Sequence, residues 1–238
     1  MISFEQMIDN LPSCFPNRQS RTARRNSQSA YPTLIAIAVL LAFFFVGCGA
    51  AHPAKFYELS APAKAGADSQ ADPYPVSVLM GPIFASHLYR EDHIVYSSKG
   101  QSMGTYEYER WVEPPTEMIQ EVLFRALRSS GRLRAVYPER SSMRGDYLLR
   151  GRLYDFKEIT GSPMAARFSL DVELREVKTG NTVWIHSYNH DEPVSGKSVS
   201  ALVEALDHNV ERATAEISAS LFQYFSAHPS SQPPASGQ

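Results

Sequence analysis

The sequence predicts an α+β domain of two layers, in which two amphipathic helices, the C-terminal one long, cover a mostly antiparallel sheet. Two patterns support this prediction. Apolar and polar residues alternate along residues 168–175 and along the neighbouring stretch 147–159, which is the period of a half-buried strand. Apolar residues recur every three or four positions in residues 116–130 and 198–227, which is the period of a helix with one buried face.

The chain begins with the features of an export signal. Residues 34–46 form an uncharged apolar run. This run is shorter than the roughly 20 residues that a membrane-spanning helix needs, but it has the length of the apolar part of a signal peptide. Four arginines and no acidic residue lie between Asp9 and the run. Positive charge at this place keeps the preceding segment in the cytoplasm during insertion.

A cysteine follows the apolar run almost directly. The sequence Phe45-Val46-Gly47-Cys48 resembles the lipobox of bacterial lipoproteins, in which the thiol receives a diacylglycerol and the chain is cut before the cysteine. Phe45 departs from the leucine that is usual there. The alternative is an uncleaved signal anchor with Cys48 as an ordinary buried residue. Because the apolar run is short, we expect a lipoprotein signal peptide at residues 1–47 and a lipid on Cys48.

The remaining chain is expected to form one domain between two polar segments. Residues 48–72 are predicted to be a lipidated tether and linker, because they end in the small, polar stretch APAKAGADSQAD. Residues 73–227 form the predicted domain, and residues 228–238 are a predicted disordered tail rich in Ser and Pro. With Cys48 acylated, the mature chain keeps no free thiol for a disulfide, a metal site or a nucleophile.

Three short strands are expected before the first helix, because β-branched and aromatic residues gather in them. They lie at residues 76–80, 93–97 and 105–112. The proline pair at residues 114–115 ends the third strand, since proline cannot donate a hydrogen bond to a sheet. Gly131 is expected to end the helix that follows.

The strongest strand signals form a meander. Turns at residues 161–163 and 178–181 connect strands 147–159, 168–175 and 182–190. If the first two strands pair as a hairpin, two arginines of one face two acids of the other across the exposed side. These four residues are Arg150 and Arg152, and Asp171 and Glu173.

Two patterns look like chemical sites but have simpler interpretations. Residues 196–198 (Gly-Lys-Ser) look like the end of a phosphate-binding loop, but Asp191 stands where that motif needs a glycine, so we expect a turn and a helix N-cap. His186 and His190 lie four residues apart, which is roughly 13 Å on a strand. One metal ion cannot bridge that distance, and we expect both to belong to the exposed face of the sheet.

The composition argues against several function classes. Removing the four basic and two acidic residues of the signal changes the net charge from −2 to −4, which offers no basic cluster for nucleic acid. No G-x-S-x-G, H-E-x-x-H or paired-cysteine motif occurs after Cys48. We therefore expect a protein that is not an enzyme and has no cofactor, metal or nucleic-acid partner.

Residues 106–115 (YEYERWVEPP) combine aromatic and charged side chains. Tyrosine, tryptophan and arginine are enriched where proteins contact partners. The alternative is that the aromatic rings pack beneath the first helix while the charges stay in water.

Several motifs follow one another in a recognisable order. They are Phe56-Tyr57-Glu58-Leu59, Gly81-Pro82, Leu88-Tyr89-Arg90, Glu109-Arg110-Trp111-Val112-Glu113-Pro114 and Asp146-Tyr147. Over residues 55–225 this order resembles the ABC-type transport auxiliary lipoproteins, which are encoded beside lipid-transport operons of the mammalian-cell-entry (MCE) type. The most specific part, residues 109–114, is similar to that family's R-W-x-E-P junction into the first helix.

The resemblance implies a non-enzymatic, lipid-anchored envelope component that works with an MCE-domain protein and an ABC permease and ATPase in the transport of phospholipid or other lipids. It makes Arg110, Trp111 and Glu113 candidates for junction or partner-binding residues. Gly49, where aspartate would retain a lipoprotein at the inner membrane, favours the outer membrane. The alternatives are a lipid-binding carrier with an apolar groove between helix and sheet, and an envelope assembly factor.

Overall fold

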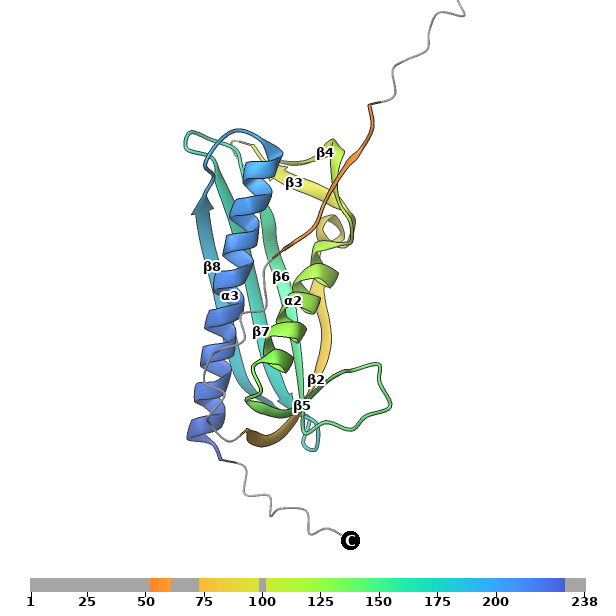
Figure 1. The fold of residues 1–238 in the computed structure, drawn as a ribbon, viewed down its shortest axis with the longest axis vertical. Helices are drawn as coiled ribbons and strands as arrows, with labels where there is room; N and C mark the ends of the chain where they lie inside the picture. Colours follow the sequence, from red (N-terminus) through yellow and green to blue (C-terminus); the bar gives the residue numbers. More distant parts are fainter. Residues whose placement is uncertain (1–51, 61–72, 99–101, 230–238) are drawn as a thin grey trace, which may run out of the picture. The chain divides into compact units, whose positions relative to one another are not determined.

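The structure is a computed structural model that describes residues 52–60, 73–98 and 102–229. The expected signal peptide, Cys48 and most of the predicted tail lie outside these residues. Within the described residues, eight strands form one sheet (Figure 1). They are β1 (Lys55–Tyr57), β2 (Tyr74–Ala85), β3 (His93–Ser97), β4 (Met103–Trp111), β5 (Leu133–Pro138), β6 (Tyr147–Ile159), β7 (Ala165–Glu176) and β8 (Thr182–Pro193).

Strand β6 organises the sheet. On one side it pairs along its length with β7, which in turn pairs with β8. On the other side its first part pairs with β2, and its last three residues, 157–159, pair with β3. Strands β2 and β3 therefore lie end to end along β6, and the register of β6 on β7 shifts between Leu153 and Asp155. Strand β5 extends the sheet beyond β2, whereas β4 and then β1 extend it beyond β3.

The predicted fold class is confirmed. The two longest ladders, β6–β7 and β7–β8, are antiparallel, and so is the β3–β4 pair. Four shorter pairings, β1–β4, β2–β5, β2–β6 and β3–β6, are parallel. Strands β1 and β5 were not expected, because three and six residues are too few to show a clear period. Strand β1 lies within residues 48–72, so the expected tether contributes a strand to the sheet.

Two long helices cover one face of the sheet, and a short 3-10 turn, η1 (His87–Tyr89), precedes β3 (Figure 1). Helix α2 (Pro115–Ser129) begins with proline, whose fixed φ and missing N–H suit the first helical position. Helix α3 (Val199–Ala227) is roughly 44 Å long at 1.5 Å per residue. One stripe along α3 is buried against the sheet: Leu202, Leu206, Val210, Ala213, Ile217 and Leu221.

A buried asparagine fixes α3 on the sheet. Asn209 has no exposed surface. Its Nδ2 donates to the carbonyl oxygens of Ala166 (3.0 Å) and His190 (3.1 Å), and its Oδ1 accepts from the Tyr188 hydroxyl (2.6 Å). Burial raises the pKa of Tyr188 to about 12, so the hydroxyl remains protonated and able to donate. A fully satisfied polar group in a core allows few alternative positions of the helix.

The predicted hairpin forms, and its two arginines face the two acids as expected. Arg150 lies opposite Glu173 and Arg152 lies opposite Asp171, and the Arg150 Nε donates to Glu173 Oε1. The helix cap is also confirmed, because the Ser198 hydroxyl accepts from the amide of Ala201 at 3.2 Å.

The prediction for the two histidines of β8 was wrong in part. Both lie on the strand, but on the side that faces α3 and not on the exposed face. His186 Nε2 lies 3.3 Å from Glu216 Oε1, and His190 contacts Arg212. The reason is that β8 is an edge strand, where polar side chains on the helix-facing side still reach water and helix charges.

Candidate functional site

The junction between β4 and α2 is built on Trp111. Its side chain is 1% exposed, its ring centroid lies 5.5 Å from that of Phe156, and its amide donates to the Asp92 carbonyl (2.7 Å). The indole Nε1 has no hydrogen-bond partner among the described residues. Trp111 is therefore part of the core. Of the two roles considered for it, structural junction and partner contact, its burial fits the structural one.

Arg110 lies beside this junction on the surface. Its side chain is 30% exposed, and its Nη1 donates to Asp92 Oδ1 at 3.0 Å. Asp92 thus holds two consecutive residues of β4, through its carboxylate and through its carbonyl oxygen. The guanidinium keeps further donors that a partner can reach.

Glu113 is exposed and lines a hollow of about 640 Å³ next to the start of α2. The Gly81-Pro82 motif of β2 lines the same hollow, so two motifs far apart in the sequence meet here. A Cβ on Gly81 would lie 3.0 Å from Leu148 Cδ1, which leaves little room for a larger residue. The other charged residues of this hollow are mainly acidic: Glu117, Glu121, Glu139 and Arg140.

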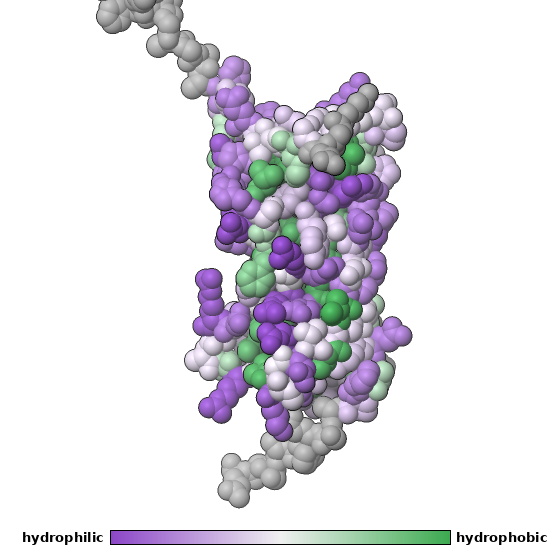
Figure 2. Space-filling model, turned by 180° about the vertical axis from the view of Figure 1, so that it is seen from behind, coloured by the Kyte–Doolittle hydropathy of each residue, from purple (hydrophilic) through white to green (hydrophobic). Residues whose placement is uncertain are grey.

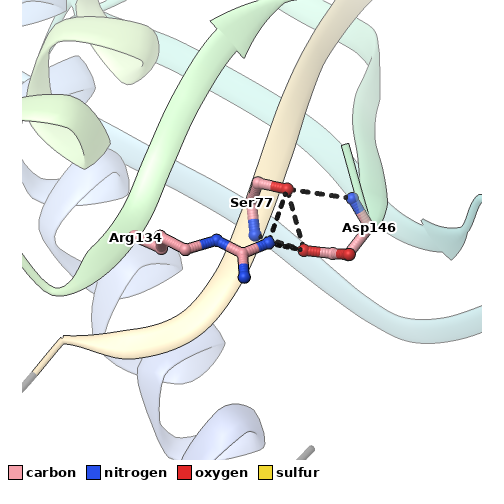
Figure 3. Close-up of polar contacts among 3 residues, drawn as sticks. All are labelled: Ser77, Arg134 and Asp146. Carbon is pink, nitrogen blue, oxygen red and sulfur yellow. Dashed lines mark hydrogen bonds and ion pairs between the residues drawn. The ribbon is translucent and has the colours of Figure 1, made fainter. Parts of the chain in front are cut away.

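The Asp146-Tyr147 motif has a structural role that sequence reasoning did not assign (Figure 3). The Asp146 carboxylate accepts from the amide and the hydroxyl of Ser77, at 2.7 and 2.8 Å, and from Arg134 Nη2 at 2.8 Å. These contacts join the start of β6 to β2 and β5. Ser77 is only 4% exposed, so this is an internal fastening of the sheet.

The sheet face opposite the helices is uncovered (Figure 2). We call it the open face and define it by three exposed apolar side chains: Phe84 (50% exposed), Tyr154 (48%) and Ile185 (63%). They line a hollow of about 340 Å³. Its charged lining consists of the hairpin residues predicted to face one another: Arg150, Arg152, Asp171 and Glu173.

The charges of the open face are largely paired with each other. Arg150 binds Glu173. A hydrogen bond with Asp171 raises the pKa of the Tyr154 hydroxyl. The Arg152 guanidinium lies over the Tyr154 ring, 5.7 Å from its centroid. The result is a surface on which apolar groups alternate with pre-positioned charges. No sequence signal indicated this surface, because His186 and His190 were expected on the exposed face of the strand, which would place Ile185 on the buried one.

A second apolar hollow, of about 600 Å³, lies between α2 and α3. Its apolar lining comes from both helices: Val122, Ala126, Ala215, Ala219 and Phe222. Polar residues line it as well, and among them Arg212 Nη2 binds Glu192 Oε2 at 2.8 Å. The volume is in the range of small-ligand sites. The expected carrier groove lay between helix and sheet, whereas this one lies between the two helices.

Within residues 52–60, 73–98 and 102–229, no cluster of three or more His, Cys, Asp and Glu side chains is arranged to hold a metal ion. In the same part of the chain, none of the helices combines the length and the apolar character needed to cross a bilayer.

Residues 57–218 match the family described as ABC-type transport auxiliary lipoprotein component. A comparison with curated protein sequences gives no match. A crystal structure of a Xanthomonas campestris protein superposes with a TM-score of 0.66 at 20% identity, covering 73% of this chain and 98% of that one. A crystal structure of an uncharacterized protein gives 0.57 at 13% identity, with coverages of 71% and 99%. These two likenesses show the fold, and the family match over most of the length shows that the chain belongs to the ABC-type transport auxiliary lipoproteins.

Proposed function

We propose that this protein is a membrane-anchored periplasmic accessory lipoprotein of an ABC/MCE-type lipid transport system, in which it acts as a non-enzymatic docking or scaffold component. Family membership supports the link to an ABC transporter. The partners would be an MCE-domain protein and the permease and ATPase of the same system. ATP hydrolysis would belong to the ATPase, since the Gly-Lys-Ser tripeptide of this chain is a helix cap.

The proposed anchor is a lipid on Cys48, after removal of residues 1–47. Several acyl chains hold a protein at a membrane far more firmly than one, because each buried methylene contributes about 0.8 kcal/mol. Gly49 supports sorting to the outer membrane, where the protein would hold one end of a lipid-conducting assembly.

The observation that carries the docking role is the open face. Phe84, Tyr154 and Ile185 are large apolar side chains that the fold itself leaves uncovered. Interfaces typically combine such anchors with arginines and paired charges at their margin. Arg110 and Glu113 are proposed as further partner contacts, because both are accessible beside the first helix.

Co-purification from native membranes tests this proposal. Full-length tagged protein, extracted in mild detergent, is expected to bring the MCE protein with it. Phe84→Ser and Ile185→Ser are expected to reduce the recovered MCE protein severalfold, because each removes an apolar anchor from the open face. Val177→Ser is the matched control, since Val177 is 51% exposed but lies in the turn after β7.

Two outcomes would count against this proposal. Absence of the MCE protein from the wild-type preparation, with that protein intact in the membranes, would contradict the partner. Equal losses with Val177→Ser and the two open-face variants would contradict the assigned surface.

The hollow between α2 and α3 favours a second candidate, a lipid-binding carrier. Native mass spectrometry after gentle extraction separates the two functions. A carrier retains phospholipid in a fixed stoichiometry, and Ala219→Trp, which fills the hollow, would release it. A scaffold shows no bound lipid beyond its covalent anchor.

A further inference from the structure

The chain between the proposed anchor and the fold is short. Lys55, the first residue of β1, follows Cys48 by seven residues. A fully extended chain advances at most about 3.6 Å per residue, so this connection spans no more than roughly 25 Å. A membrane contact near β1 rests on the proposed lipidation, since an acylated Cys48 would keep β1 next to the bilayer.

Strand β1 directs one aromatic side chain into the core and the next one away from it. Tyr57 lies opposite Trp111 of β4 and packs against the core, whereas Phe56 lies opposite Arg110. Tyr108 lies two residues before Arg110 on β4, and its ring is 5.3 Å from the ring of His52, which precedes β1, so Tyr108 borders the same edge as Phe56. Phe56 is 60% exposed and Tyr108 is 42% exposed.

Other exposed apolar and basic groups lie on or beside the same two strands. Met103, at the start of β4, is 41% exposed, and Val112, just after β4, is 49% exposed. Lys55, directly before Phe56, projects to the other side of β1, where its side chain is 70% exposed and binds Glu109 at 3.4 Å. The His52 ring lies 5.3 Å from the Tyr108 ring. Aromatic side chains flanked by lysine are the composition that proteins place at a membrane–water interface.

We propose that Phe56 and Tyr108 form a membrane-contacting surface that enters the headgroup region of the bilayer holding the acyl anchor. A bilayer is the proposed partner of this surface, because the short connection to Cys48 keeps these side chains within reach of the membrane whatever else the protein binds. The contact adds a second, non-covalent attachment. It also limits rotation of the domain about its tether, so that the open face takes a defined direction relative to the membrane.

Site-specific fluorescence in liposomes tests this contact. The full-length chain is expressed so that it is processed and acylated, and is then reconstituted into phosphatidylethanolamine–phosphatidylglycerol vesicles. The described residues contain no cysteine, so one introduced cysteine carries a polarity-sensitive dye. Tyr108→Cys leaves Phe56 in place, and Phe56→Cys leaves Tyr108 in place. Ile185→Cys is the matched control, because it replaces an apolar residue of similar exposure on β8, at another edge of the sheet.

Emission at positions 56 and 108 is expected to shift to the blue and to be quenched by spin-labelled lipids, whereas emission at position 185 changes in neither respect. Circular dichroism confirms that each variant is folded. Equal emission at all three positions, with Cys48 acylated by intact mass, overturns the membrane contact and leaves the proposed function standing. The same result would follow if a protein, and not lipid, covers this surface. A bare thiol at Cys48 overturns the anchor and this inference together.

Discussion

The amide and the hydroxyl of Ser77 both donate to one carboxylate, that of Asp146, at 2.7 and 2.8 Å (Figure 3). The residues are 69 positions apart in the sequence, and their contact sets where β6 begins alongside β2. Ser77 is almost entirely buried, whereas the Asp146 side chain is 28% exposed, so removal of the carboxylate leaves the Ser77 amide without its protein acceptor.

Asp146→Ala is therefore expected to lower the free energy of unfolding by about 1–3 kcal/mol, since it leaves the buried Ser77 amide without its acceptor. Arg134→Ala removes only the outer partner of the same carboxylate. The Arg134 side chain is 54% exposed. The expected cost of this substitution is below about 1 kcal/mol. Urea unfolding of both variants checks this order, and similar losses for the two would contradict the assigned role of Asp146.

Two replacements of Trp111 distinguish the contribution of its ring to stability from that of its N–H group. Trp111→Ala is expected to cost about 3–5 kcal/mol, because it opens a cavity against Phe156. Trp111→Phe is expected to cost roughly 1–2 kcal/mol, because the Nε1 donates to no described residue and no hydrogen bond is lost. Thermal unfolding measures both. A phenylalanine variant as unstable as the alanine variant would show that the N–H group has a buried partner.

The Gly-Lys-Ser tripeptide gives a test of capping against nucleotide binding. Ser198→Ala is expected to destabilise α3 by about 1 kcal/mol, because the amide of Ala201 loses its acceptor. Lys197→Ala is expected to change stability by less than about 0.5 kcal/mol. Unfolding midpoints with and without ATP–Mg²⁺ supply the measurement. A stabilisation by nucleotide that Lys197→Ala abolishes would contradict the capping interpretation.

The pair of Arg167 and Asp191 predicts a response to acid. Two hydrogen bonds of 2.7 Å from the guanidinium lower the pKa of Asp191. A lowered pKa in the folded state means that the pair contributes its full stabilisation above the unfolded value, about 3.9, and loses it as the pH falls through the folded value. Both side chains are more than a third exposed, so the contribution is expected to stay below about 1 kcal/mol.

This response is measured by comparing wild type with Arg167→Ala in urea at several pH values. The difference in unfolding free energy should be constant near neutrality and shrink below about pH 4. A difference that grows on acidification would reverse the assigned sign. Arg128→Ala serves as a control, because its guanidinium lies over the Phe124 ring, 5.8 Å from the ring centroid.

The local parts of this fold follow from the sequence. The alternation in β6 and β7 predicted that Arg150 and Arg152 share the exposed face with Asp171 and Glu173, because the other face of the hairpin must be dry. The spacing of Ser198 before an apolar helical repeat gave the cap. In both cases the information lies within a few residues or across a single turn.

Long-range features did not follow in the same way. Nothing in β2 or β3 indicates that they share one side of β6, since parallel pairing of distant segments leaves no local period. The face of His186 depended on β8 being an edge strand, which is a property of the whole sheet. The burial of Trp111 likewise depends on Phe156, 45 positions away in the chain, whereas Arg110 stays accessible beside it.

The division of β6 between two neighbours has a mechanical consequence. Among the described residues, the backbone connection of β1, β4 and β3 to the rest of the sheet is the short β3–β6 pairing at residues 157–159, extended by the hydrogen bond from the Thr160 amide to the Ser97 carbonyl oxygen. If the proposed lipid anchor pulls on β1 while a transporter binds the open face, the force passes through the β3–β6 pairing and the Trp111–Phe156 contact. Under load the anchor-proximal strands would yield first, while α3 and the long hairpins keep their shape.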